Sequence, residues 1–274
     1  MPYVRTRLGR WFYEERGAAK RPRDPAILLL HGFMFDGRMW KRQVEPLAEI
    51  GRVVVIDGPG HGRSEAPPRF MLEDQADALL DVYAELGIER AVIVGLSWGG
   101  MVGMRMAIQH AERVKALALL DTNADVEVRG DRIKYRLLLA FVRRYGMPPS
   151  LAEREATPKM FSAAFRREQP DVVESYVRAA RGFERDGFCR AGLAVLVKRK
   201  DIAGKIGSIH APALVVCGSA DSATPVAKSE AIARAIPGAR LVVVDGAGHM
   251  SAIEKPVEVN GVVVPFVREH VSGA

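Results

Sequence analysis

The sequence contains little cysteine and no long hydrophobic run. Its 274 residues include two cysteines, Cys189 and Cys217, which are too few to cross-link a chain of this size. We therefore expect both thiols to be reduced. The charged N-terminal residues lack the apolar stretch of a signal peptide, and no run approaches the roughly 20 residues that span a bilayer. These absences predict a cytoplasmic protein with no membrane partner.

The sequence also lacks the signatures of nucleic-acid and metal sites. The net charge is +7, but lysines and arginines are spread along the chain and no nucleic-acid-binding motif accompanies them. No spacing of histidine, cysteine and acidic residues is typical of a metal site. We therefore expect no nucleic acid, no metal and no organic cofactor, and the pattern says nothing about oligomeric state.

What the sequence does contain is an alternation of short apolar runs and amphipathic stretches. A predicted hairpin around Leu8-Gly9-Arg10 comes first, and a series of nearly continuous apolar runs follows. Helix-length amphipathic stretches, such as residues 71–86 and 101–110, lie between most of these runs. The alternation predicts the α/β class, with a mostly parallel sheet of about eight strands and helices on both faces. The runs are residues 26–30, 52–56, 91–94, 115–120, 213–217 and 241–244.

The alternation stops after the sixth predicted strand. Residues 125–204 look helical throughout, so we expect a helical insertion there and a core formed by residues 1–124 and 205–274. Prolines at Met147-Pro148-Pro149-Ser150 and at Thr157-Pro158 should break the insertion into several short helices.

The C-terminal segment, residues 257–270, should form a closing helix. Gly261 and Pro265 are poor helix formers. We therefore expect a kink or a late start in this helix.

The strongest local signal is Gly95-Leu96-Ser97-Trp98-Gly99-Gly100, which follows an apolar run and opens an amphipathic stretch. This G-x-S-x-G pattern is typical of a sharp strand-to-helix turn that lifts a serine hydroxyl into a cleft. The helix directs its free amides and the positive end of its dipole at the same point. Ser97 is therefore the candidate nucleophile, and the Trp98 amide is a candidate donor to an oxyanion.

A dinucleotide site is an alternative for the same segment. Gly95-x-Ser97-x-x-Gly100 lies between a strand and a helix, and Asp121 ends the next strand about twenty residues on. The middle position is a serine, however, where a glycine must let the pyrophosphate approach. We therefore favour the nucleophile.

A serine nucleophile needs a base, and His249 is the best candidate among the six histidines. It lies in the glycine-rich loop Gly246-Ala247-Gly248-His249, directly after an apolar run. Asp221 follows another run and precedes a helix expected near Pro225, so it is the candidate acid that orients the imidazole. Asp121 and Asp245 remain alternatives for this acid.

The loop after the first long apolar run, His31-Gly32-Phe33, provides a second candidate oxyanion donor, the Phe33 amide. We expect His31 and His61 to hold loops in place rather than to transfer protons in catalysis.

Together these motifs resemble the α/β-hydrolase superfamily, and its capped serine esterase and enol-lactonase-like branch. The order of serine, acid and histidine in that superfamily matches Ser97, Asp221 and His249. The resemblance implies that residues 125–204 form a cap over the active site. Serine at position 97 disfavours haloalkane dehalogenases and epoxide hydrolases, which carry aspartate there. The motifs are HGF at 31–33, DGPGHGRS at 57–64, GLSWGG at 95–100, GSADSATP at 218–225 and GAGH at 246–249.

The resemblance and the motifs together predict a hydrolase that cleaves a small-molecule carboxylic ester or lactone through an acyl-enzyme, without a cofactor. Two alternatives stay open. One is another acyl-transfer enzyme, such as a thioesterase or a cofactor-free perhydrolase. The other is a receptor-like binding module that keeps the triad.

The insertion offers two kinds of residue to a substrate site. Its basic residues either attract a substrate carboxylate or form a solvated helix face. Its large apolar residues either line an acyl pocket or pack in the core. The basic residues are Arg132, Lys134, Arg136, Arg143, Arg144, Arg166, Arg167, Arg178, Arg181 and Arg185, and the apolar residues are Leu137, Leu138, Leu139, Phe141, Phe161, Phe165 and Phe183.

Overall fold

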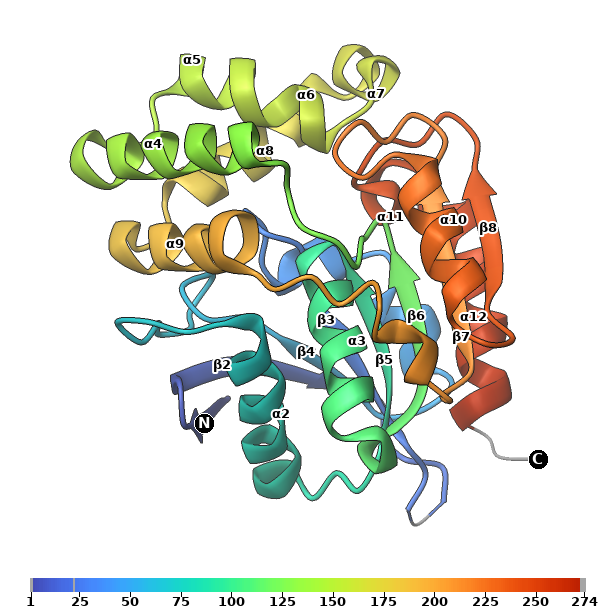
Figure 1. Cartoon of the computed structure of the whole chain (residues 1–274). Helices are drawn as coiled ribbons and strands as arrows, with labels where there is room; N and C mark the ends of the chain where they lie inside the picture. The colour runs from blue at the N-terminus through green and yellow to red at the C-terminus, as the bar shows by residue number, and fades with distance from the viewer. Residues whose placement is uncertain (1, 22, 272–274) are drawn as a thin grey trace.

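An eight-stranded sheet forms the centre of the protein, with the strand order β1-β2-β4-β3-β5-β6-β7-β8 (Figure 1). The computed structural model describes residues 2–21 and 23–271. β1 and β2 form an antiparallel hairpin, β2 pairs antiparallel with β4, and the remaining pairs are parallel. The predicted α/β class is therefore confirmed. The strands are β1 (Tyr3–Thr6), β2 (Gly9–Arg16), β3 (Ala26–Leu30), β4 (Val53–Ile56), β5 (Ala91–Leu96), β6 (Val114–Leu120), β7 (Ala213–Gly218) and β8 (Arg240–Val244).

Helices cover both faces of the sheet, which is why its central strands are apolar at nearly every position. α2, α3 and α10 pack on one face, and α1 and α12 pack on the other. Short helical turns connect several elements. The helices that cover the sheet are α1 (Val44–Ala48), α2 (Leu72–Leu86), α3 (Trp98–Gln109), α10 (Val226–Ala235) and α12 (Pro256–Val271). The short helical turns are η1 (Gly37–Trp40), η2 (Ala111–Arg113), η5 (Ile206–Ser208) and α11 (Ser251–Glu254).

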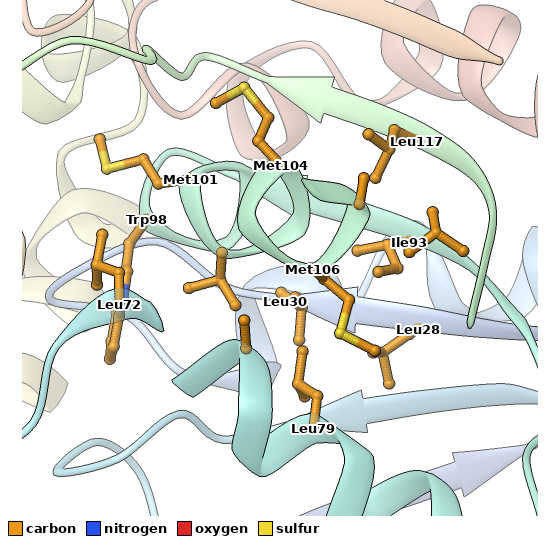
Figure 2. Close-up of a cluster of buried hydrophobic side chains, with 14 of the residues drawn as sticks. Leu28, Leu30, Leu72, Leu79, Ile93, Trp98, Met101, Met104, Met106 and Leu117 are labelled. Carbon is orange, nitrogen blue, oxygen red and sulfur yellow. The ribbon is translucent and has the colours of Figure 1, made fainter. Parts of the chain in front are cut away.

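Two hydrophobic cores result, one on each face of the sheet. Side chains alternate along a strand, so Leu28 and Leu30 of β3 enter the first core, whereas Ile27 and Leu29 enter the second. Figure 2 shows the first core, where side chains of α2 and α3 meet those of the strands. Both free cysteines are buried.

Between β6 and β7, where every residue is described, the chain forms helices and no strand. Figure 1 shows these helices gathered beyond the end of the sheet to which the arrowheads of β6 and β8 point. They therefore lie over the carboxyl ends of the parallel strands. The elements are α4 (Arg129–Tyr145), α5 (Pro149–Leu151), α6 (Thr157–Met160), α7 (Ala163–Glu168), α8 (Pro170–Arg181) and α9 (Arg185–Gly192), with π-helical turns η3 (Ala152–Ala156) and η4 (Leu193–Lys198).

No helix formed by residues 2–21 or 23–271 is long and apolar enough to cross a membrane.

The prolines of this segment act differently from one another. Pro148 lies between α4 and α5, and Pro149 begins α5, so the chain breaks there as predicted. The helix continues, however, through Thr157-Pro158 by way of η3 and α6. The Thr157 amide and hydroxyl both donate to the Ala152 carbonyl. The predicted break at Thr157-Pro158 is therefore wrong, because the wider π-helical turn accommodates a residue without an amide donor.

The predicted closing helix is present, but it does not start late. α12 begins at Pro256 and continues to Val271 with Pro265 inside it, so the expected late start is wrong. Val259, Val263 and Val267 are fully buried, and their spacing of four residues places them on one face of the helix. Burial of this face against the sheet outweighs the poor helix propensity of single residues.

Replacing Gly261 with alanine should stabilise the protein. Gly261 is exposed in α12, and a Cβ atom there would meet nothing within 4 Å. Because alanine restricts the unfolded chain, we expect about 0.5–1 kcal/mol of added stability and a Tm about 1–4 °C higher in thermal unfolding. As a control, Gly99→Ala should lower the Tm, because its Cβ would lie 2.1 Å from the Leu30 carbonyl oxygen. An unchanged Tm for Gly261→Ala would contradict the prediction.

Candidate active site

Ser97 lies at a sharp turn between β5 and α3. Its φ of 51° and ψ of −112° are a strained conformation for a residue with a side chain. The turn closes because its neighbours are small: a Cβ on Gly95 would lie 2.4 Å from the backbone carbon of Gly99. The Ser97 amide donates to the Leu120 carbonyl at 2.8 Å and anchors the turn to β6. The serine consequently faces the cavity beyond the sheet.

His249 and Asp221 are hydrogen-bonded to each other. His249 Nδ1 lies 2.8 Å from Asp221 Oδ2, and both side chains are buried. Asp221 Oδ1 accepts hydrogen bonds from the amides of Ala223 and Thr224 at 2.8 and 2.9 Å. The Thr224 hydroxyl donates to Asp221 Oδ2 at 2.6 Å. Because Nδ1 faces a carboxylate, it carries the imidazole proton, and Nε2 remains available as a base.

The electrostatics of this pair suit a base. Burial by itself lowers the pKa of His249, but the charge of Asp221 and its hydrogen bond outweigh burial and raise the pKa above its ordinary value of 6.5. Burial likewise raises the pKa of Asp221, but His249 and the bonds from Thr224 outweigh it and hold this pKa below the ordinary range. Asp221 is therefore ionised at neutral pH and stabilises the protonated imidazole.

Asp121, the first alternative acid, is hydrogen-bonded to residues other than His249. It accepts hydrogen bonds from the Gly218 amide at 2.9 Å and from the amide and hydroxyl of Ser251. Burial and the neighbouring charge of Asp221 raise its pKa to about 8. Asp121 is therefore protonated more readily than Asp221. Its complete burial also excludes the ribose contact that the dinucleotide alternative requires.

Asp245, the second alternative acid, is exposed. Its carboxylate accepts a hydrogen bond from the Ser219 hydroxyl at 3.1 Å. Within residues 2–21 and 23–271, Asp221 is the carboxylate to which His249 is hydrogen-bonded.

The amides of Phe33 and Trp98 have the surroundings expected of oxyanion donors. Neither donates a hydrogen bond to another residue in the part of the chain that the structure describes. The Trp98 amide is the first of α3, where the positive end of the helix dipole favours an anion.

Two buried histidines join the loops after β3 and β4. His31 Nε2 accepts a hydrogen bond from the Gly58 amide at 2.7 Å, and His61 Nε2 accepts one from the Met34 amide at 3.2 Å. Burial, helped by the nearby His31, lowers the pKa of His61 well below 6.5, so this ring is neutral. The two bonds fix the backbone next to Phe33. This is the loop-holding role expected of both histidines.

A cavity of about 230 Å³ has both Ser97 and His249 in its wall. Helices of the segment between β6 and β7 provide most of the remaining wall, which is largely apolar. Of the apolar insertion residues singled out in the sequence, Leu138 and Leu139 line the cavity. Leu137 and Phe141 are exposed instead.

The basic residues that were singled out in the insertion lie outside the cavity wall. None of the arginines considered as substrate ligands, nor Lys134, is in the cavity wall, which favours the solvated-face alternative. Two other cations, Lys159 and Arg199, do line it. Sequence reasoning missed both, because nothing in the pattern separates them from the many basic residues nearby.

Thr224 and Glu254 also support the His249–Asp221 pair and were not among the sequence candidates. The buried Glu254 carboxylate accepts hydrogen bonds from the Gly248 amide at 3.1 Å and the Ser162 amide at 3.2 Å. It thereby ties the His249 loop to the helical segment. Thr224 lies in the GSADSATP motif, which is a usable signal, whereas no motif marks Glu254.

Comparison with known proteins identifies the family. Residues 25–256 match a family model described as alpha/beta hydrolase fold. The 3-oxoadipate enol-lactonase 1 of Acinetobacter baylyi is 26% identical, over 89% of this chain and 89% of its own. A thermophilic esterase from Thermogutta terrifontis has a TM-score of 0.90 at 30% identity over 98% of both chains. The enol-lactonase from Burkholderia xenovorans LB400 has a TM-score of 0.89 at 30% identity, over 98% of this chain and 100% of its own. The chain therefore belongs to the α/β-hydrolase fold family, in an esterase and enol-lactonase-like branch.

Proposed function

We propose that the protein is a serine hydrolase that cleaves a carboxylic ester or lactone, with Ser97 as nucleophile, His249 as base and Asp221 as the orienting acid. One observation carries the proposal. Ser97 and His249 line the same cavity, and His249 Nδ1 lies 2.8 Å from Asp221 Oδ2. This contact favours the tautomer in which Nε2 is free to act as a base. Relatives named as esterases and enol-lactonases support the same class of substrate.

In the acylation step, the Ser97 oxygen bonds to the carbonyl carbon while His249 Nε2 accepts the serine proton. The oxyanion of the tetrahedral intermediate accepts hydrogen bonds from the amides of Phe33 and Trp98. The imidazolium then donates its proton to the departing alkoxide, which leaves as an alcohol. In deacylation, water attacks the acyl carbon while His249 Nε2 accepts a proton from it. The imidazolium then returns this proton to the Ser97 oxygen as the acyl bond breaks and the carboxylic acid departs.

Residues 125–204 act as the cap in this proposal, with residues 1–124 and 205–274 as the catalytic core. Helices of the cap close the cavity above Ser97 and so determine which acyl groups fit. The cavity is smaller than a typical drug-sized site. We therefore expect a preference for short acyl chains.

Hydrolysis of p-nitrophenyl acetate, butyrate and octanoate tests the proposal. We expect steady-state turnover, with kcat/KM lower for octanoate than for butyrate because the cavity is small. Burst kinetics would report the acyl-enzyme. A protein that binds these esters without turnover would be a receptor-like module, and dependence on an acceptor other than water would indicate a transferase.

The activity should depend on pH through His249. The imidazole must be neutral to accept the Ser97 proton, and its pKa is raised above 6.5. Activity should therefore be complete well above that pKa and be lost as the pH falls through it. The measurement is kcat/KM for p-nitrophenyl butyrate between about pH 5 and pH 9. An acid limb with a midpoint below 6.5 would contradict this assignment of the base.

A further inference from the structure

The cavity wall contains a cation that is not ion-paired with any carboxylate of residues 2–21 and 23–271. Lys159 of α6 is half-buried in this wall, and its Nζ lies 2.6 Å from the hydroxyl of Tyr135 in α4. The same Nζ lies 4.9 Å from the centre of the Tyr135 ring. An ammonium group has three donors and no acceptor. Tyr135 occupies one donor, so two remain for a ligand or for water.

Most of the other charged side chains of the wall are ion-paired. Arg199 is paired with Glu127 at 2.9 Å, and Glu155 is paired with Lys134 at 2.7 Å. Asp131 also lines the wall. Glu155 and, to a lesser degree, Asp131 raise the pKa of Lys134, so the charge of Asp131 is partly balanced by that exposed lysine. Lys159 is therefore the wall cation that remains available to an incoming anion.

We propose that Lys159 and Tyr135 form an anion-binding subsite, and that the substrate is an ester or lactone bearing a second, ionised carboxylate. The inference rests on the proposed function for the reaction at Ser97. It adds a charged group at the end of the substrate that lies away from the reacting carbonyl. A carboxylate at this point accepts a charge-assisted hydrogen bond from Lys159, and the Tyr135 hydroxyl donates a second while it accepts from the lysine.

The surroundings strengthen this subsite. Leu138, Leu151 and Met160 line the same cavity, so apolar side chains also contribute to the wall that contains the cation. Hydrogen bonds to a charged group are stronger where water is partly excluded. The apolar side chains also provide contacts for the methylene groups between the two ends of a dicarboxylic monoester.

Pairs of esters that differ only in charge test the subsite. Monoethyl succinate and monoethyl adipate are compared with ethyl isohexanoate and ethyl isooctanoate, in which an isopropyl group replaces the carboxylate. Hydrolysis is followed by base uptake at constant pH. We expect wild type to favour at least one monoester over its apolar counterpart, and Lys159→Met to reduce that preference about tenfold through KM. Lys159→Arg should keep it.

Arg136→Met is the matched control. Arg136 is exposed on α4 and lies outside the cavity wall, so the variant removes the same charge without touching the subsite. Its preference for the monoester should equal that of wild type. Equal losses in Lys159→Met and Arg136→Met would mean attraction by overall charge, and would overturn the subsite.

Binding measured in a Ser97→Ala background separates the subsite from catalysis. Calorimetric titration should show that Lys159→Met weakens binding of the favoured monoester about tenfold and leaves its apolar counterpart unchanged. Equal affinities with and without Lys159→Met would refute the subsite. An absence of turnover by wild type would instead overturn the proposed function, and the titration would still decide the subsite.

Discussion

Ser97→Ala should lower kcat for p-nitrophenyl butyrate by at least about 10⁴-fold and leave KM within a few-fold of wild type. Without the hydroxyl no acyl-enzyme forms, and only the oxyanion donors and substrate binding remain to assist attack by water. A fluorophosphonate probe, which bonds covalently to an activated serine, should label wild type and fail to label the variant. Alanine keeps the Cβ of serine, so the strain of this turn is unchanged and the variant should fold as wild type does.

Ser222→Ala provides the control for this loss. Ser222 lines the same cavity, and its hydroxyl donates to the Pro158 carbonyl at 3.2 Å. Its variant should keep both turnover and labelling. Retention of labelling in Ser97→Ala would mean that another residue is the nucleophile, and the proposed mechanism would fail.

Asp221→Asn should cost about 10⁴-fold in kcat while the protein stays folded. An amide that presents its NH₂ group to His249 favours the wrong tautomer, and it also removes the charge that stabilises the imidazolium. In wild type, the Asp221 carboxylate accepts hydrogen bonds from His249, from the amides of Ala223 and Thr224, and from the Thr224 hydroxyl. Steady-state kinetics measure the loss, and circular dichroism checks the fold.

Asp121→Asn distinguishes the two buried acids. Asp121 has a pKa raised to about 8 by burial and by the charge of Asp221, and it is hydrogen-bonded to Gly218 and Ser251 rather than to His249. We expect this variant to keep kcat at pH 7 within roughly tenfold of wild type. If Asp121→Asn were as damaging as Asp221→Asn, the acid would have been assigned incorrectly.

The core of the fold was predictable because its signals are local. Buried parallel strands are apolar at successive positions, and β3, β4, β5 and β7 follow this rule closely. The turn at Ser97 was predictable for a similar reason, since only small residues fit at Gly95 and Gly99. Each of these features is contained within a few neighbouring residues.

Features that depend on distant partners were not predictable in the same way. α12 tolerates Gly261 and Pro265 because its buried valines pack against the sheet, and that contact is not visible in the segment itself. Glu254 joins the His249 loop to the helical segment through the amide of Ser162, 92 residues away in sequence. Lys159 becomes distinctive through its place in the cavity wall and its contact with Tyr135.

The helical segment leaves and re-enters the sheet at neighbouring positions. β6 and β7 pair directly, with Leu117 opposite Ala213, so the strands that bracket the segment need not move if its length or sequence changes. Ser97 precedes it in the chain, and Asp221 and His249 follow it. In the proposed hydrolase, bond cleavage and the choice of substrate are therefore inherited as separable parts of one gene. Under that proposal, selection for a new ester acts on residues 125–204 while the apparatus that breaks the bond is passed on unchanged.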